Sequence, residues 1–331
     1  MKEVLVLVFM IISLNLYASP EWGDDVLIND GPSKGMAIDY DNTGTLYAWV
    51  HVYNSSGMDT MKLYSSPDSG RNWYLRKNNL FDVRAFDIDV VNGNYSSYLF
   101  CYVVDNNILR VIRYNLPNLT YETNSMIDYS NNDKHWVVAR NISNVTGYVI
   151  RVAYSVDVQG NSDSTAVWYR ESTDSGITWG DSVIIASNDD GDWDEIFDFA
   201  YGMHLGMGYF YFCGSRKSTF DNYALCWSSN LNFPHPLIIW NIQGIDYRYP
   251  NIAVSRSISD SAKICIVYGR KDITGDWCIH AVTSKNGGNS FTQQTIFDST
   301  NFDDNYPVVD ITSNAFYSDT CFILAFRTSF S

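Results

Sequence analysis

Three arginine residues recur at nearly equal spacing in the second half of the chain. Arg216, Arg270 and Arg327 each follow a run of aromatic and apolar residues, and 54 and 57 residues separate them. A guanidinium group binds a carboxylate through two parallel hydrogen bonds, so converging arginines would hold an acidic group in one orientation. The alternative is a structural repeat that copies one arginine for packing or for pairing between neighbouring units. The spacing is compatible with both.

Acidic and aromatic residues gather between the predicted strands. The clearest segments are residues 189–195 (DDGDWDE), 246–249 (DYRY) and 303–306 (DDNY). Aromatic rings beside hydrogen-bonding carboxylates suit sugars, and the same carboxylates could bind structural calcium. The alternative is a solvated rim. The five histidines are scattered, and no spacing is that of a zinc site. Apart from that calcium, we expect no cofactor.

A short pattern, Ser-x-Asp/Asn-x-Gly-x-x-aromatic, indicates the elements that position these residues. It occurs at residues 66–73 (SPDSGRNW), 172–179 (STDSGITW) and 284–291 (SKNGGNSF). Ser and Asp side chains hold a tight turn, Gly takes a positive φ, and the aromatic ring buries a large apolar surface. Degenerate copies lie halfway, at residues 114–121 and 228–233, so the period is 53 to 56 residues.

A repeat of this length with several short strands is typical of a β-propeller. The sequence predicts an all-β, six-bladed propeller. Residues 22–28 (WGDDVLI) are similar to residues 179–185 (WGDSVII), which follow a turn, so we expect them to close the last blade as its outer strand. That blade shows only two strands of its own and is expected to be incomplete at the C-terminus. The predicted blades cover residues 34–76, 84–126, 136–185, 195–240, 249–296 and 306 onward.

The first 18 residues resemble a secretion signal. Lys2 precedes an apolar run over residues 4–16, which is short for a membrane span, and Ala18 suits cleavage. We therefore expect a secreted protein, extracellular or periplasmic, with one domain over residues 19–331 and no membrane span in the mature chain. The alternative is an uncleaved membrane anchor. The net charge of −15 disfavours nucleic acid and anionic membranes as partners, and it opposes a polyanion unless a local basic patch overrides it.

Four of the six cysteines form two similarly spaced pairs. Cys213 and Cys226 are 13 residues apart, and so are Cys265 and Cys278. Each pair falls on neighbouring strands of one predicted hairpin, so cross-strand disulfides are feasible in an oxidising compartment. Buried thiols are the alternative. The remaining two, Cys101 and Cys321, have no obvious partner.

The turns and their spacing resemble the sialidase (neuraminidase) superfamily of Asp-box, or BNR-repeat, six-bladed propellers, over nearly the whole mature chain. The resemblance implies a glycan or glycoprotein as partner, and we expect a monomer. In this superfamily three arginines bind the sugar carboxylate. The resemblance assigns Arg216 and Arg270 to the second and third of these positions, while Lys34 stands at the first and lacks the planar fork. Arg327 shares the repeat position of the other two.

The superfamily uses a tyrosine nucleophile activated by a glutamate, with an aspartate as acid/base, which departs from the usual two-carboxylate glycosidase. The resemblance assigns these roles to Tyr306, Glu195 and Asp59. The sequence therefore predicts a glycan-recognising, sialidase-like propeller with lost or changed catalysis. The alternatives are an exo-sialidase that releases terminal sialic acids, another glycan-directed enzyme, and a non-catalytic propeller that binds protein. Any enzyme activity would be that of a glycoside hydrolase of sialidase type.

Overall fold

The computed structural model consists of strands and turns, and none of the residues that it describes is helical. The prediction of an all-β chain is confirmed. The chain divides into two compact units, an N-terminal unit (Tyr17–Asp157 with Trp168–Val183) and a C-terminal unit (Met1–Leu16, Val158–Val167 and Ile184–Ser331). The described residues are 5–8, 27–29, 33–52, 59–92, 96–129, 133–144, 147–158, 161–187, 193–217, 223–229, 235–255, 261–271, 275, 277–297, 302–313 and 320–330.

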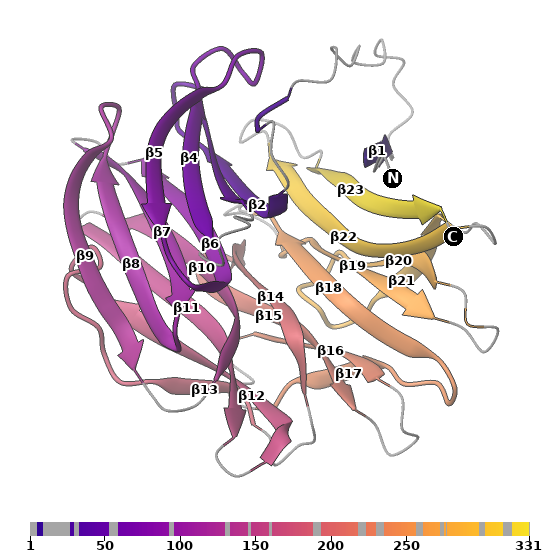
Figure 1. The fold of residues 1–331 in the computed structure, drawn as a ribbon. Coiled ribbons are helices and arrows are strands. Elements are labelled where there is room, and N and C mark those ends of the chain that lie inside the picture. Colours follow the sequence, from indigo (N-terminus) through magenta and orange to yellow (C-terminus); the bar gives the residue numbers. More distant parts are fainter. Residues whose placement is uncertain are drawn as a thin grey trace. The chain divides into compact units, whose positions relative to one another are not determined.

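Five four-stranded antiparallel sheets follow one another along the chain, each with its strands in sequence order (Figure 1). This arrangement is consistent with a propeller. Sheet 1 consists of β2 (Ser33–Tyr40), β3 (Leu46–Val52), β4 (Thr60–Ser66) and β5 (Tyr74–Leu80). Sheet 2 consists of β6 (Val83–Asn92), β7 (Ser97–Asp105), β8 (Ile108–Asn115) and β9 (Thr120–Tyr129). Sheet 3 consists of β10 (Lys134–Asn144), β11 (Gly147–Val158), β12 (Asn161–Ser172) and β13 (Val183–Ala186).

The remaining four-stranded sheets belong to the C-terminal unit. Each of the five sheets begins and ends within a few residues of a predicted repeat. Sheet 4 consists of β14 (Trp193–His204), β15 (Met207–Lys217), β16 (Tyr223–Ser229) and β17 (Leu237–Trp240). Sheet 5 consists of β18 (Asp246–Val254), β19 (Ile264–Lys271), β20 (Trp277–Ser284) and β21 (Thr292–Phe297).

Sheet 6 has three strands, in the order β1 (Leu5–Val8), β23 (Thr320–Phe330) and β22 (Phe302–Ser313). A strand near the N-terminus thus joins the last sheet, but it differs from the predicted one. The pairing strand has the sequence LVLV and lies inside the predicted signal. Leucine and valine suit a strand that covers an open edge. Within residues 22–28 only Leu27 and Ile28 are described, and neither is in a strand.

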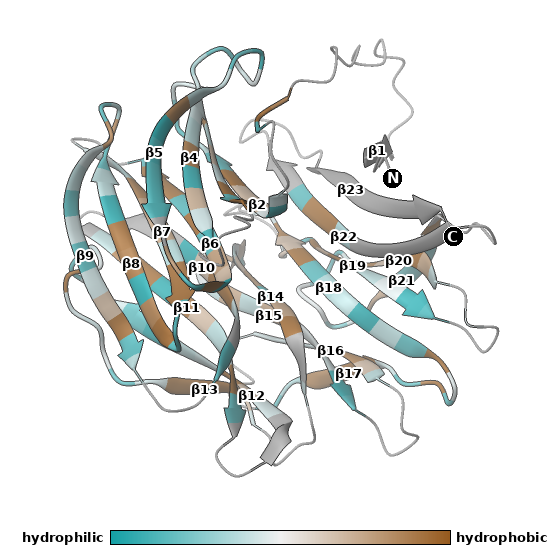
Figure 2. Cartoon of the chain, in the orientation of Figure 1, coloured by the Kyte–Doolittle hydropathy of each residue, from teal (hydrophilic) through white to brown (hydrophobic). Residues whose placement is uncertain are grey.

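Apolar side chains from adjacent sheets form the cores. Between sheets 2 and 3, Phe100 and Tyr102 pack with Ile150, Val152 and Tyr154, all at most 2% exposed. The third strand of sheet 2, β8, mixes hydrophobic and hydrophilic residues (Figure 2). Leu109 and Val111 join this core, while Ile112 and Tyr114 join the core with sheet 1, so both faces of the strand are covered. A second core, in the C-terminal unit, lies between sheets 4 and 5.

The predicted turns share one hydrogen-bond network between third and fourth strands. The hydroxyl of Ser172 donates to Asp174 Oδ1 at 2.8 Å and accepts from Gly176 N at 2.8 Å, and Thr178 N donates to Asp174 Oδ1 at 2.9 Å. Gly176 has a φ of +80°, as predicted for this position. Trp179 packs against the core. Equivalent bonds join Ser66, Asp68, Gly70 and Asn72, and also Ser284, Asn286, Gly288 and Ser290.

The first strand of each four-stranded sheet, and β22 in sheet 6, contains a β-bulge near its start. A bulge inserts extra residues opposite a regular partner strand and redirects the side chains beside it. In β18 the bulge includes Tyr249, whose φ of +56° lies in the left-handed region. The register shifts fall between Ser33 and Gly35, Val83 and Ala85, Lys134 and Val137, Trp193 and Phe197, Arg248 and Asn251, and Asn305 and Val308.

The predicted cysteine pairs do not form disulfides. Cys213 lies opposite Trp227, one residue from Cys226, and a one-residue offset points two side chains to opposite faces of a sheet. Cys265 lies opposite Thr283, five residues along the strand from Cys278. The buried-thiol alternative therefore holds for these four cysteines. Cys101 is also a buried thiol, and the side chain of Cys321 lies outside the described residues.

Candidate functional site

Two predicted site residues, Lys34 and Asp59, form an ion pair in sheet 1. Lys34 Nζ donates to Asp59 Oδ2 at 2.9 Å, and His51 Nε2 lies 2.9 Å from the same oxygen. The side chain of Lys34 is 48% exposed, whereas those of Asp59 and His51 are 13% and 7% exposed. The ring of Phe86 meets the His51 ring edge to face at 5.8 Å. The structure thus brings the two predicted residues together and adds His51.

This pairing opposes the acid/base role of Asp59. The hydrogen bond from Lys34 outweighs partial desolvation and lowers the pKa of Asp59, and a smaller contribution from His51 adds to the effect. A general acid must carry a proton near the working pH. Asp59 is instead held as a carboxylate. The arrangement suits a fixed negative charge next to a half-exposed ammonium group better than proton donation.

Two of the predicted arginines occupy the same register position in consecutive sheets. Arg216 on β15 lies opposite Trp193, and Arg270 on β19 lies opposite Tyr247. The Arg216 guanidinium lies 5.7 Å from the centre of the Trp193 ring. Arg270 hydrogen-bonds with Tyr247, whose pKa is raised by burial and held down by this arginine. Arg216 and Arg270 thus lie at equivalent positions of their second strands, and each contacts the aromatic residue across from it.

More cations lie over aromatic rings in the same unit. Arg248 lies 3.9 Å from the centre of the Tyr223 ring, and Asp246 accepts from Tyr223 N at 2.9 Å. Lys271 lies 5.7 Å from the ring centre of Trp277. We call Arg216, Arg248, Arg270 and Lys271, with their rings, the cation–aromatic group. Cations over ring faces are stabilised by the ring quadrupole. The rings of Tyr223 and Trp277 are part-exposed, whereas Trp193 and Tyr247 are buried, 2% and 1% exposed.

The remaining predicted site residues are placed by their backbones alone. Glu195 lies in the bulge of β14, between Trp193 and Phe197, and Tyr306 lies in the bulge of β22. Arg327 lies on β23, opposite Asn305 and, on its other side, Leu5. The side chains of Glu195, Tyr306 and Arg327 lie outside the described residues. The predicted pairing of Tyr306 with Glu195 therefore stays a prediction.

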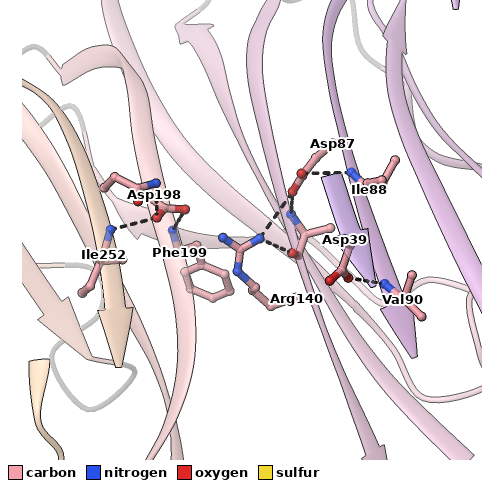
Figure 3. Close-up of polar contacts among 10 residues, drawn as sticks. Asp39, Asp87, Ile88, Val90, Arg140, Asp198, Phe199 and Ile252 are labelled. Carbon is pink, nitrogen blue, oxygen red and sulfur yellow. Dashed lines mark hydrogen bonds and ion pairs between the residues drawn. The ribbon is translucent and has the colours of Figure 1, made fainter. Parts of the chain in front are cut away.

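Sequence analysis missed a set of hydrogen-bond acceptors on first strands, the side chains of three aspartates and one asparagine. In each case the side chain accepts a hydrogen bond from a backbone amide of the following sheet. Asp39 accepts from Val90 N at 2.5 Å, and Asp87 accepts from Ala139 N at 2.9 Å. Figure 3 shows these contacts. In the C-terminal unit Asp198 accepts from Ile252 N at 2.8 Å, and Asn251 accepts from Val309 N at 2.6 Å.

The carboxylates of the N-terminal unit surround Arg140 on β10. Its Nη1 lies 3.4 Å from Asp87 Oδ2 and donates to Ala139 O at 2.6 Å (Figure 3). Asp39 and Asp89 hydrogen-bond to each other. Desolvation raises the pKa of Asp89 well above its usual value, and the charge of Asp39 adds to the effect. Burial raises the pKa of Asp39 as well, although hydrogen bonds from Val90 N and Tyr40 N oppose that rise, so the two neighbouring carboxyls favour sharing a proton.

A sequence signal for these residues exists. Each aspartate interrupts an apolar first strand, as in AID at residues 37–39, FDID at 86–89 and FDF at 197–199. A carboxylate inside a core strand needs hydrogen-bond donors. These aspartates also recur with the repeat, at the same place in the first strand. A polar residue that recurs in apolar strands could therefore have been recognised from the sequence.

The described residues contain neither a metal-binding cluster nor a membrane-crossing helix. The described residues contain no group of three or more His, Cys, Asp or Glu side chains able to hold a metal ion. Within the same part of the chain, no helix is both long and apolar enough to cross a membrane.

No protein-family model matches the sequence. No curated protein matches it either. Solved structures do resemble the fold. A protein of unknown function from Dyadobacter fermentans DSM 18053 superimposes with a TM-score of 0.53 at 10% identity, covering 89% of this chain and 94% of that one. A Hadza microbial sialidase superimposes with a TM-score of 0.48 at 11% identity, covering 89% of this chain and 65% of that one. A thermostable family-43 glycoside hydrolase superimposes with a TM-score of 0.43 at 14% identity, covering 83% of this chain and 97% of that one.

Proposed function

We propose that the chain is a secreted, sialidase-like six-bladed propeller that recognises acidic glycans through its cation–aromatic group. The observation that carries the proposal is the shared register position of Arg216 and Arg270, each beside an aromatic ring. Guanidinium groups bind carboxylates. The rings of Trp193 and Tyr247 are buried and position the two arginines, whereas the part-exposed rings of Tyr223 and Trp277 are the ones that can pack against the apolar face of a sugar. The three turns with one hydrogen-bond network support the sialidase-like assignment.

The local charge favours an acidic ligand although the chain is acidic overall. The net charge is −15, but four cations gather in the cation–aromatic group, with Asp246 as an acidic neighbour. Such a patch focuses attraction for anions despite the sign of the whole molecule. A glycan that carries a carboxylate, such as one ending in sialic acid, fits this chemistry.

The proposal assigns binding without sialidase turnover. Lys34 stands where the superfamily has an arginine, so the planar guanidinium that binds the sugar carboxylate is missing. Lys34 also keeps Asp59 ionised, which opposes the acid/base role of that residue. The second candidate is an exo-sialidase with Tyr306 as the nucleophile. It is favoured by the position of Tyr306 and Glu195 in the bulges of β22 and β14, since bulges often place functional side chains.

One experiment tests both candidates. Binding of a sialylated oligosaccharide and hydrolysis of a fluorogenic sialoside are measured on the full chain and on Arg270→Ala, Tyr306→Phe and Arg84→Ala. Arg84 is an exposed arginine on β6, paired with Asp133, and serves as the matched control. Binding that weakens about tenfold in Arg270→Ala alone, with no turnover, supports the proposal. Turnover that is lost in Tyr306→Phe establishes the second candidate. A folded chain that does neither overturns both.

The export part of the proposal has its own test. Mass spectrometry of the exported protein gives its first residue, and cleavage after Ala18 is expected. A chain that keeps Leu5–Val8 would contradict cleavage, and it would retain the strand that pairs with β23.

A further inference from the structure

The lysines and arginines of the N-terminal unit fall into two sets. Most of them lie 2.6 to 3.8 Å from a carboxylate oxygen and form ion pairs, namely Lys34, Arg84, Arg110, Arg113, Lys134, Arg140, Arg151 and Arg170. Among the described residues of this unit, the cations outside these ion pairs are Lys62, Arg71, Arg76 and Lys77. All four belong to one hairpin, which consists of β4, β5 and the turn between them. The unpaired positive charge of the unit is therefore confined to one place.

This hairpin has the opposite charge to the chain as a whole. Residues 60–80 carry four cations and one carboxylate, that of Asp68, so their net charge is +3, against −15 for the whole chain. The carboxylate of Asp68 is engaged within the turn, where it accepts hydrogen bonds from Ser66 and Asn72. A local cluster of one sign attracts ions of the other sign even when the whole molecule repels them. The hairpin is thus a basic patch on an acidic protein.

Two cations of the patch lie beside tyrosine rings. The guanidinium group of Arg76 lies 5.9 Å from the centre of the Tyr74 ring. Lys77 Nζ lies 5.8 Å from the ring centre of Tyr114, which in turn meets the ring of Tyr121 edge to face at 6.3 Å. Tyr74 and Tyr121 are 50% and 57% exposed. Charged donors beside part-exposed rings suit a sugar that carries an acidic group.

Three of the four cations are accessible to a ligand along one strand. Arg71 and Arg76 are exposed and Lys77 is half-buried, whereas Lys62 donates to Asn29 Oδ1 at 3.1 Å. β5 is the outer strand of sheet 1, and within the described part of the chain no strand pairs with its other edge. From Arg71 to Lys77 the backbone spans at most about 20 Å. We call Arg71, Arg76 and Lys77, with the ring of Tyr74, the basic strip.

We propose that the basic strip binds a linear acidic polysaccharide through the carboxylate groups of its sugars. A guanidinium group binds a carboxylate through two parallel hydrogen bonds, and an ammonium group adds a point charge. The narrowness of the strip selects among polyanions. An anionic bilayer or a nucleic acid duplex presents charge over a wider area than the strip, so it would also meet the acidic remainder of the chain. A single polysaccharide chain can follow the strand.

This site is separate from the cation–aromatic group, whose residues all belong to the other unit. It goes beyond the proposed function because it concerns different residues and a repeating acidic chain. A structural role would explain the same cations differently, since lysine and arginine on an edge strand discourage pairing with another chain. The experiment therefore measures self-association as well as binding.

Calorimetric titration of the full chain uses polygalacturonate as the acidic polysaccharide and dextran as the neutral one, at low and at physiological salt. The main variant is Arg76→Gln/Lys77→Gln. Its matched control is Arg84→Gln/Arg110→Gln, which removes the same charge from paired cations of the same unit. Arg71→Gln, with Arg84→Gln as its control, is the second test. Thermal unfolding shows that each variant folds.

We expect polygalacturonate to bind, to bind less tightly as salt rises because salt screens charges, and to weaken at least about tenfold in Arg76→Gln/Lys77→Gln. Arg71→Gln should weaken it by a smaller factor. The controls should bind like the parent, and dextran should not bind. Absence of polygalacturonate binding to the folded parent overturns the proposal, and so does an equal loss in the main variant and its control.

Three further outcomes would also overturn it. Normal binding by an Arg76→Gln/Lys77→Gln protein that self-associates would show that these cations protect the edge of the sheet. Tighter binding of phosphatidylcholine–phosphatidylglycerol vesicles or of a short DNA duplex than of polygalacturonate would identify another class of partner. Binding that is lost in Arg270→Ala and kept in Arg76→Gln/Lys77→Gln would assign the polysaccharide to the cation–aromatic group, which would leave the proposed function standing without the basic strip.

Discussion

The carboxyl groups of Asp39 and Asp89 hydrogen-bond to each other between the first strands of sheets 1 and 2. Two carboxylates in contact repel each other, so the contact requires a proton. Asp39 also accepts from Val90 N and Tyr40 N, at 2.5 Å and 2.8 Å. Burial raises the pKa of both carboxyl groups, and the amide partners of Asp39 oppose that rise there, so the shared proton favours Asp89. The junction of these two strands therefore depends on pH.

Replacement of Asp89 by asparagine should remove that dependence. Desolvation and the charge of Asp39 raise the pKa of Asp89 in the folded state, so the folded chain binds more protons than the unfolded chain above about pH 4. Stability then falls as pH rises through the folded pKa. The amide group of an asparagine at this position donates to Asp39 at every pH. We expect Asp89→Asn to be more stable than the parent at pH 8, by about 1 kcal/mol, with the difference shrinking toward pH 4.

Urea unfolding at the two pH values measures this difference. Asp82→Asn, at an exposed position in the preceding turn, is the matched control and should leave the pH dependence unchanged. An Asp89→Asn variant that is less stable than the parent at pH 8 would show that Asp89 is ionised in the folded chain.

Truncation of Asp198 should be among the most destabilising changes in the C-terminal unit. The residue is 4% exposed and accepts from Phe199 N, Ile252 N and Asn251 Nδ2, at 2.7, 2.8 and 2.7 Å. Asp198→Ala leaves these donors buried without an acceptor, so we expect a loss of about 3 kcal/mol. Asp198→Asn should lose less stability, because an asparagine oxygen can accept the same kind of hydrogen bond. In the next sheet Asn251 accepts a backbone amide hydrogen bond in this way. Equal losses in both variants would contradict this account.

The repeated turns should make the protein sensitive to acid. Desolvation raises the pKa of Asp174, but the hydrogen bonds from Thr178, Ser172 and Ile177 N together outweigh it and lower the pKa to about 2. Hydrogen bonds from Asn72 lower the pKa of Asp68 to about 2. Each carboxylate stabilises the fold above its unfolded pKa of about 3.9, and this contribution is lost as pH falls toward 2. Melting temperatures at pH 6 and pH 3 should differ less in Asp174→Asn than in the parent.

The chain supplies a reason to expect that this variant folds. The third turn already has asparagine, Asn286, at the same position, and it accepts from Ser290 N at 3.0 Å. An Asp174→Asn protein with the same acid sensitivity as the parent would mean that other carboxylates dominate acid unfolding.

Removal of the Lys34 ammonium group should raise the pKa of Asp59. The hydrogen bond from Lys34 is the largest cause of its lowered pKa, so Lys34→Met should bring the carboxyl closer to its ordinary value. NMR titration of the Asp59 carboxyl carbon measures the shift. Lys62→Met is the control on the same sheet, since Lys62 contacts Asn29 instead. If the pKa of Asp59 is the same in Lys34→Met as in the parent, the ion pair with Lys34 does not lower the pKa of Asp59.

The sequence predicted the features that arise locally. The three turns could be read because a serine, an aspartate or asparagine, and a glycine within five residues determine the turn by themselves. The shared position of Arg216 and Arg270 followed from the repeat. Contacts between sheets could not be predicted in this way. The role of Asp87 depends on the amide of Ala139, 52 residues away, and Cys213 and Cys226 fail to pair through a one-residue offset in register.

The aspartate contacts between sheets impose an unusual kind of constraint on evolution. Asp39, Asp87 and Asp198 bind amide groups, which every residue except proline carries. The residues that supply these amide groups are a valine, an alanine and an isoleucine. Because only the backbone takes part, the hydrogen bond does not depend on which side chain stands there. The side chains of neighbouring repeats can therefore diverge while the hydrogen bond between their sheets is kept, provided that no proline replaces the residue whose amide donates. A family built this way would keep its architecture long after its copies had ceased to resemble one another.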